Sequence, residues 1–217
     1  MGAQADRRMT AEEFLQWQNT QELRHELVDG VPILRVKSPD ETEPRMMTGA
    51  SPRHSQIGAN IQRALGNALE DSPCEVHQND SGVRVADDRV RYPDVVADCS
   101  GDIPNEGLLT DPRIVFEVLS RSAGQADLRE KLVNYKSVPT IEAIVYVEQE
   151  FADVEAHYRL EGDGWSTVRH TEMDEVLELP SIGVTLSLQT IYRRVRLDPR
   201  PRPRVYVVRE DGGLEPT

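Results

Sequence analysis

Long apolar runs, cysteines and positive charge are all scarce in this sequence, and each shortage excludes a class of protein. No apolar run approaches the roughly 18 residues of a membrane-spanning helix. Residues 1–8 are polar and lack the apolar segment of a signal peptide. We therefore expect a soluble, cytoplasmic protein that contacts no membrane.

Cysteine occurs only twice in the chain, as Cys74 and Cys99. The two residues have no CxxC spacing, and no histidine lies at the spacing of a zinc ligand. Neither a zinc site nor a disulfide framework is indicated, so we expect two free thiols.

Lysine and arginine are outnumbered by acidic residues, 25 against 38, which gives a formal net charge of −13. Most nonspecific affinity for nucleic acid comes from basic side chains that neutralise phosphates. The net charge therefore counts against a broad electrostatic grip on nucleic acid. Any such binding requires a local cluster of positive charge, a metal ion or a partner.

The local patterns predict an α+β (α/β) fold, with a mixed central β-sheet flanked by helices. Thr10 and Glu13 form a capping box that predicts a helix, and Asp29–Gly30 predicts a tight hairpin turn. Pro32 places the second hairpin strand at a sheet edge. The predicted elements are helix 11–17, strands 25–28 and 31–36, a mobile loop 37–50, a helix from 51, strands 75–79, 82–86, 90–99 and 114–119, helix 125–136 and strand 141–147. They continue with a hairpin of 153–160 and 165–170, strands 177–179 and 184–186 and a helix over 188–195.

The chain is long enough for one domain with a full apolar core. We expect a flexible N-terminus over 1–9, one domain over 10–197 and a tail over 198–217. Seven arginines and one aspartate lie between Arg193 and Arg209, and three prolines favour an extended tail. A strand, a helix and a strand over 114–147 predict a parallel crossover.

Two acidic residues interrupt strongly apolar segments. Asp94 lies within Tyr92–Val96, and Glu117 lies within Ile114–Ser120. Burying a lone carboxylate costs several kcal/mol or forces its protonation, so a partner such as a divalent cation is expected. Lys131 follows on the next predicted helix. Two carboxylates on a hard cation, with a lysine to orient or deprotonate water, suit metal-assisted phosphodiester hydrolysis.

Each of these residues also has a purely structural interpretation. Asp94 can cap a turn, Glu117 can pair with Arg113 or Arg121, and Lys131 can be a solvated helix residue. Each structural interpretation is favoured when its residue is taken singly. The order of the three residues along the chain favours a functional site.

Short motifs from Thr10 to Val195 resemble the Uma-type restriction endonuclease family of the PD-(D/E)xK nuclease-like superfamily. The resemblance implies a restriction endonuclease-like core, an N-terminal helix and hairpin, a C-terminal β-hairpin and hydrolysis of nucleic-acid phosphodiesters. It implies that Asp94, Glu117 and the backbone carbonyl of Val118 bind Mg²⁺ or Mn²⁺, and that Lys131 orients water or stabilises charge. The motifs are MTAEEF, RHELVDG, SPRHSQI, YPDVV, FEVLS, DLREKLVNY and IEAIVYV.

The chain departs from the strict superfamily pattern at Leu119, where a lysine is usual two residues after the acid. Lys131 must then act from the helix, as the Uma-type family implies. Glu26 and His54 are further candidate catalytic residues. Glu26 either faces the metal or is a surface charge beside Arg24, and His54 either contacts the scissile phosphate or has a structural role.

Two more residues allow two interpretations each. Tyr135 either positions Lys131 or belongs to the core. Asp98, on the same strand face as Asp94, is either a remote ligand or the end of the strand.

The function implied by this resemblance is a Mg²⁺- or Mn²⁺-dependent endonuclease that acts on nucleic acid, with DNA favoured. We also expect a homodimer, since cutting two strands usually needs two active sites and a C2 pair supplies them. The alternative is a catalytically inactive binding or regulatory protein with the nuclease fold. A basic rim of Arg53, Arg84, Arg89 and Arg91 around the acids would favour the enzyme, and its absence the alternative. A third hypothesis makes the arginine-rich tail the functional part.

Overall fold

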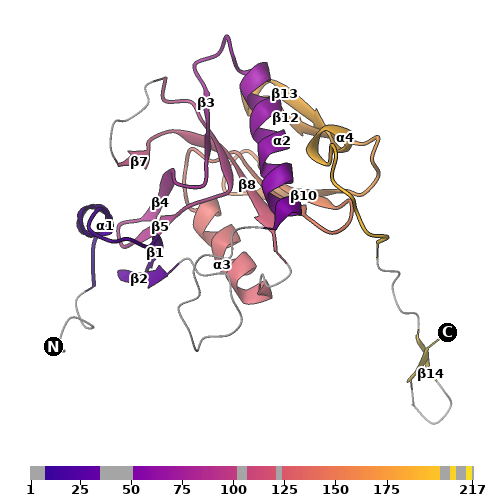
Figure 1. The fold of residues 1–217 in the computed structure, drawn as a ribbon, viewed down its shortest axis with the longest axis horizontal. Helices are drawn as coiled ribbons and strands as arrows, with labels where there is room; N and C mark the ends of the chain where they lie inside the picture. Colours follow the sequence, from indigo (N-terminus) through magenta and orange to yellow (C-terminus); the bar gives the residue numbers. More distant parts are fainter. Residues whose placement is uncertain are drawn as a thin grey trace.

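Two β-sheets form the centre of the computed structural model (Figure 1). The structure describes residues 8–34, 51–101, 107–120, 124–200, 206–208 and 214–216. The loop expected at 37–50 lies outside the described residues, as does Arg121. Within the described part of the chain, no helix is long and apolar enough to cross a membrane.

The first sheet contains the predicted N-terminal hairpin. Helix α1 (Ala11–Gln18) precedes it and begins at the predicted capping box, in which Thr10 and Glu13 exchange hydrogen bonds of 3.1 and 3.2 Å. Asp29 and Gly30 both have positive φ, 50° and 76°, as a tight two-residue hairpin turn requires. The five strands, in the spatial order β2-β1-β5-β4-β7, are β2 (Val31–Leu34), β1 (His25–Val28), β5 (Arg89–Arg91), β4 (Gly82–Ala86) and β7 (Leu108–Leu109).

The second sheet carries the predicted parallel crossover. Strands β8 and β9 pair in parallel, and helix α3 (Gln125–Lys136) connects them. All other neighbours in this sheet pair antiparallel, so the sheet is mixed, as expected. Its strands, in the spatial order β11-β10-β9-β8-β6-β3, are β11 (Trp165–His170), β10 (Val154–Arg159), β9 (Ala143–Glu148), β8 (Pro112–Leu119), β6 (Val95–Asp98) and β3 (Glu75–Gln78).

Two helices cover opposite faces of this sheet (Figure 1). The apolar face of α2 (Pro52–Ala68) packs on a cluster that includes Phe116 and Val118. Tyr135 of α3 packs on the other face, in a cluster with Val115. Successive side chains of a strand point to opposite faces, so Glu117 of β8 points to the α3 side.

The C-terminal elements complete the core beside α2. Residues of β12, β13 and α4 belong to the same apolar cluster as α2. Helix α4 is shorter than the helix expected over 188–195, and the last two strands form a pair that the sequence patterns did not predict. The elements are β12 (Val176–Leu179), the 3₁₀ helix η1 (Pro180–Ile182), β13 (Val184–Ser187), α4 (Leu188–Ile191), β14 (Tyr206–Val208) and β15 (Leu214–Pro216).

The single strand predicted over 90–99 is wrong. The structure divides this segment into β5 and β6, which belong to different sheets. Pro93 has no backbone N–H for a β-ladder, so pairing is interrupted where the chain passes from one sheet to the other. Asp94 therefore lies at the junction of the two sheets, just before β6.

The expectation of free thiols is also wrong, because Cys74 and Cys99 form a disulfide bond. Antiparallel pairing of β3 with β6 places Glu75 opposite Asp98, which brings the two neighbouring cysteines together. This pairing cannot be read from the spacing of two cysteines alone. Disulfides are rare in reducing cytoplasm, so this bond counts against the cytoplasmic location, which stays a prediction.

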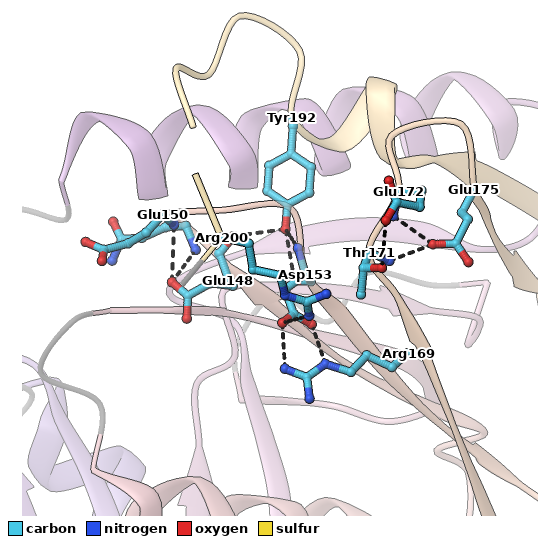
Figure 2. A network of polar contacts seen from close by, with 10 residues as sticks. Glu148, Glu150, Asp153, Arg169, Thr171, Glu172, Glu175, Tyr192 and Arg200 are labelled. Carbon is cyan, nitrogen blue, oxygen red and sulfur yellow. Dashed lines mark hydrogen bonds and ion pairs between the residues drawn. The ribbon is translucent and has the colours of Figure 1, made fainter. Parts of the chain in front are cut away.

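The first residues of the arginine-rich tail are attached to the domain, and Asp153 receives one of them, Arg200 (Figure 2). Arg169 donates to both Asp153 oxygens, at 2.7 and 2.5 Å, and Arg200 donates to one of them at 2.5 Å. Burial alone would raise the pKa of Asp153, but the hydrogen bonds from the two arginines outweigh it and lower the pKa. Asp198 pairs in turn with Arg53 of α2 at 2.7 Å. The chain is thus fixed to the domain as far as Arg200.

Candidate active site

Asp94 is held between the first turn of α2 and the end of β8. Its Oδ2 atom accepts a hydrogen bond of 2.8 Å from the backbone N–H of Val118. The Nε2 atom of His54 lies 3.2 Å from the same oxygen, although it makes no hydrogen bond of good geometry within the described residues. Asp94 is 7% exposed, so its carboxylate is largely removed from water.

Glu117 lies on the α3 face of the sheet and receives three hydrogen bonds from that helix. Lys131 Nζ is 3.2 Å from Oε1 and 3.1 Å from Oε2, and the Tyr135 hydroxyl donates to Oε1 at 2.7 Å. The side chain is 6% exposed. Burial raises the pKa of Glu117, Lys131 opposes that rise, and the charge of nearby Asp94 adds to it. The two acids are therefore close enough to repel each other.

Lys131 is a buried cation rather than a solvated helix residue. Burial alone would lower its pKa, but the charges of Glu117 and Glu26 raise it above the usual 10.5. An amine that stays protonated cannot remove a proton from water. It can orient water and stabilise negative charge. Of the two roles expected for Lys131, to orient water or to deprotonate it, the protonated amine suits the first.

Glu26 is connected to the site through Arg91. Arg91 donates to Glu26 at 2.8 Å through Nη1, to Glu130 at 2.5 Å through Nη2 and to Asn134 at 2.9 Å through Nε. Arg91 is 2% exposed, and the charge of Glu26 contributes to the raised pKa values of Glu117 and Lys131. The surface interpretation of Glu26 is therefore wrong, and Arg24 pairs elsewhere, with Asp80.

Arg91 was expected in a basic rim around the acids, but its burial and its hydrogen bond to Asn134 were not predicted. Arg91 lies one residue before Tyr92 in an alternating strand, where arginines are usually exposed, so its burial left no local signal. Tyr135 is both a core residue and a hydrogen-bond donor, but it contacts Glu117 rather than Lys131. Asp98 ends its strand, since its carboxylate accepts from the N–H groups of Ser100 and Asp111.

The geometry contradicts one structural interpretation, the pairing of Glu117 with Arg113, whereas Arg121 lies outside the described residues. Glu117 pairs with Lys131, whereas Arg113 pairs with Asp111 and Glu142. Asp94 does bond to a backbone N–H, but that group belongs to β8 rather than to its own turn. The structure thus brings Asp94, Glu117, Val118, Lys131 and His54 into one region.

The donors present fit a hard divalent cation. Among the residues that the structure describes, no cluster of three His, Cys, Asp or Glu side chains is present. If Asp94, Glu117 and the Val118 carbonyl hold the ion, as the resemblance implies, they would supply oxygen donors only, the ligands that Mg²⁺ prefers. Asp94 and Glu117 are both largely buried, and the charge of Asp94 raises the pKa of Glu117, so a cation bound beside them would favour their ionised forms.

The four arginines expected to surround the acids, Arg53, Arg84, Arg89 and Arg91, do not form a basic rim. Three of them pair with acids of the same chain, Arg53 with Asp198, Arg84 with Glu12 and Arg89 with Asp29, and Arg91 is buried. None of the four offers an unpaired cation to a phosphate. This correction removes the source of positive charge that the sequence suggested.

The mixed sheet, the two flanking helices and the buried acid–lysine pair define a restriction endonuclease-like fold. The chain belongs to the Uma2 family, described as "Putative restriction endonuclease", whose model matches residues 11–190.

Comparisons with known proteins agree with this fold. The crystal structure of "a putative nuclease belonging to DUF820" from Anabaena variabilis ATCC 29413 is similar, with a TM-score of 0.62 and 18% identity, over 85% of this chain and 97% of the other. The "Uncharacterized protein slr1290" of Synechocystis sp. (strain ATCC 27184 / PCC 6803 / Kazusa) is 27% identical over 188 residues, 86% of this chain and 92% of that protein. The "Uncharacterized protein sll1609" of the same strain is 28% identical over 161 residues, 71% of this chain and 82% of that protein.

Proposed function

We propose that this protein is a divalent-metal-dependent endonuclease that hydrolyses phosphodiester bonds of nucleic acid, with DNA as its substrate. The observation that carries the proposal is geometric: the side chains of Asp94 and Glu117 are largely buried, and Lys131 Nζ lies 3.1 Å from a Glu117 oxygen. Membership of the Uma2 family supports it.

In this proposal, Asp94, Glu117 and the Val118 carbonyl hold Mg²⁺ or Mn²⁺, which supplies Lewis acidity and lowers the pKa of water. Lys131 keeps its proton and stabilises the negative charge that develops on the phosphate. Tyr135 holds the Glu117 carboxylate in place by its 2.7 Å hydrogen bond. His54, whose Nε2 lies 3.2 Å from Asp94 Oδ2, restrains that carboxylate or contacts the phosphate.

Metal binding and cleavage test the proposal together. Mn²⁺ is titrated calorimetrically into wild type, Asp94→Asn and Glu117→Gln, and the same samples are incubated with DNA and RNA in Mg²⁺. We expect cleavage of DNA by wild type alone and loss of Mn²⁺ binding in both variants. Glu178→Gln, on the exposed face of β12, is the matched control and should behave as wild type. Cleavage that survives in both site variants would refute the proposal.

We further propose that the protein acts in the cytoplasm and that its active form is a homodimer. The reason for the dimer is that cutting two strands requires two sites, which a C2 pair supplies. Light scattering coupled to size-exclusion chromatography measures the mass directly. A monomeric mass at concentrations that support double-strand cleavage would contradict the dimer.

One observation favours a second function, that of a nuclease-fold protein that binds without turnover. The four arginines expected to face phosphates are paired or buried, and the net charge is −13. DNA binding by wild type in Mn²⁺, with no cleavage of any substrate, would establish this function. Truncation after Arg200 tests the tail separately, because it leaves the contacts of Asp198 and Arg200 in place.

A further inference from the structure

Gln149 is a buried amide that joins the two elements on either side of Asp94. It directly follows β9 and is 4% exposed. Its Oε1 atom accepts a hydrogen bond from the Ser51 hydroxyl, and its Nε2 atom donates to the Leu119 carbonyl at 2.9 Å. One side chain thus connects the start of α2 to the end of β8.

Both ends of this bridge continue directly to Asp94. Ser51 is the N-cap of α2, and its hydroxyl accepts from the backbone N–H of His54 at 3.1 Å. The His54 ring lies 3.2 Å from Asp94 Oδ2. On the other side, Leu119 follows Val118, whose N–H donates to the same oxygen at 2.8 Å. The contacts therefore form a closed ring of which the Asp94 carboxylate is one member.

We propose that Gln149 is a positioning residue that fixes the Asp94 carboxylate for metal binding by setting the spacing between α2 and β8. The proposal rests on the proposed function, because it assigns Asp94 the role of metal ligand. Only a side chain that both accepts and donates can serve this bridge, since Ser51 offers a hydroxyl proton and Leu119 a carbonyl oxygen. Residues that orient metal ligands in this way typically change metal affinity by about 10- to 100-fold when replaced.

Two substitutions separate the donor and acceptor functions. Gln149→Leu removes both hydrogen bonds, whereas Gln149→Glu keeps an acceptor for Ser51 but faces the Leu119 carbonyl with a second oxygen. Asn60→Leu is the matched control. Asn60 is a buried amide of α2, the helix that Ser51 caps. It donates to the carbonyls of Ile191 at 2.9 Å and Arg193 at 2.8 Å, which lie outside the ring.

The first readout is the dissociation constant for Mn²⁺, measured calorimetrically without nucleic acid. The second is the NMR signal of the His54 ring, one of only five histidines, assigned with a His54→Gln variant. We expect both Gln149 variants to weaken Mn²⁺ binding about tenfold and to move the His54 signal. Asn60→Leu should lower the melting temperature without either change.

Should Gln149→Leu fail to fold, Ser51→Ala and Ser51→Thr replace it, because Ser51 is exposed and only alanine removes the hydroxyl. The alanine variant should move the His54 signal and weaken Mn²⁺ binding, and the threonine variant should do neither.

The outcomes distinguish this inference from the proposed function. Gln149 variants that match Asn60→Leu in Mn²⁺ affinity and in the His54 signal would overturn the positioning role, even if wild type binds metal and cleaves DNA. Absence of Mn²⁺ binding in wild type would refute the proposed function and, with it, positioning for metal. An unmoved His54 signal would then show in addition that Gln149 does not maintain the ring.

Discussion

Lys131→Met keeps most of the length of the lysine side chain but removes the charge beside Glu117. The two charged groups are 3.1 Å apart, and their side chains are 13% and 6% exposed. At an effective dielectric constant of about 20, the gross Coulomb attraction at this distance is about 5 kcal/mol. Desolvation offsets part of this attraction, and loss of one partner of a buried pair typically costs about 3–5 kcal/mol. We expect Lys131→Met to lower the free energy of unfolding by this amount at pH 8.

A double-mutant cycle with Glu117→Gln isolates the charge interaction. Glutamine keeps an oxygen for the Tyr135 hydroxyl but carries no charge. In this background, Lys131→Met should cost only about 1 kcal/mol, the value of an ordinary hydrogen bond. Urea denaturation of the four proteins should therefore give a coupling free energy of about 2–4 kcal/mol.

The pH dependence of the Lys131→Met cost checks the same reasoning. Burial raises the folded-state pKa of Glu117 above 4.5, and removal of Lys131 takes away the charge that opposes this rise. A carboxyl whose pKa is higher in the folded state favours folding at low pH and disfavours it as pH rises through that pKa. The cost should be full at pH 8 and shrink as pH falls toward 4.5. A cost that is equal in both backgrounds and at both pH values would refute the assigned ion pair.

Three further predictions concern other parts of the molecule. Arginine hydrogen bonds lower the pKa of Asp153 below 3.8, so the contribution of Asp153 to stability is present above that pH and lost below it. Asp153→Asn should therefore lower the free energy of unfolding, measured by urea denaturation, by about 2 kcal/mol at pH 7 and by progressively less below pH 3.8. A cost independent of pH would contradict the ion pairs. The disulfide joins cysteines 25 residues apart, so reduction by dithiothreitol should lower the free energy of unfolding by about 3.5 kcal/mol. The double variant Cys74→Ala/Cys99→Ala should be insensitive to dithiothreitol. Equal stability of wild type with and without the reductant would show that the bond does not contribute. Mn²⁺ at about 100 times its dissociation constant should stabilise wild type by about 2.7 kcal/mol, seen as a higher melting temperature. The same Mn²⁺ concentration should not stabilise Glu117→Gln. An equal rise in melting temperature in both proteins would place the metal elsewhere.

The sequence predicted most of the fold because its local signals agree with the tertiary structure. The capping box at Thr10, the Asp29–Gly30 turn and the apolar face of α2 each act over a few residues, and each is where the pattern placed it. Segment 90–99 failed because its apolar pattern continues through the junction between two sheets. Only Pro93 marks the break, and a proline at that position is also compatible with a strand start.

The candidate site divides along the same line. An acid within an apolar strand is unusual enough to identify Glu117, and an acid after a proline at a strand start identifies Asp94. The partners of these acids depend on which helix covers which face, which no local pattern contains. The burial of Arg91 and the contacts of Gln149 were therefore not predicted, since they arise from residues 43 and 98 positions away, Asn134 and Ser51.

The charges around the site favour a dication over a second lysine or arginine. Among the described residues, Lys131 pairs with Glu117, and Arg91 pairs with Glu26 and with the partly exposed Glu130. The charge of Asp94 adds to the negative charge beside Glu117 and raises the pKa of Glu117. Arg91 already uses three nitrogens on Glu26, Glu130 and Asn134, and Lys131 is engaged by both oxygens of Glu117. A divalent ion beside Asp94 and Glu117 would balance the charge without displacing either side chain, whereas the phosphate of a nucleic acid would increase the imbalance. Metal binding is therefore expected to precede nucleic-acid binding, and wild type without metal should bind DNA weakly or not at all.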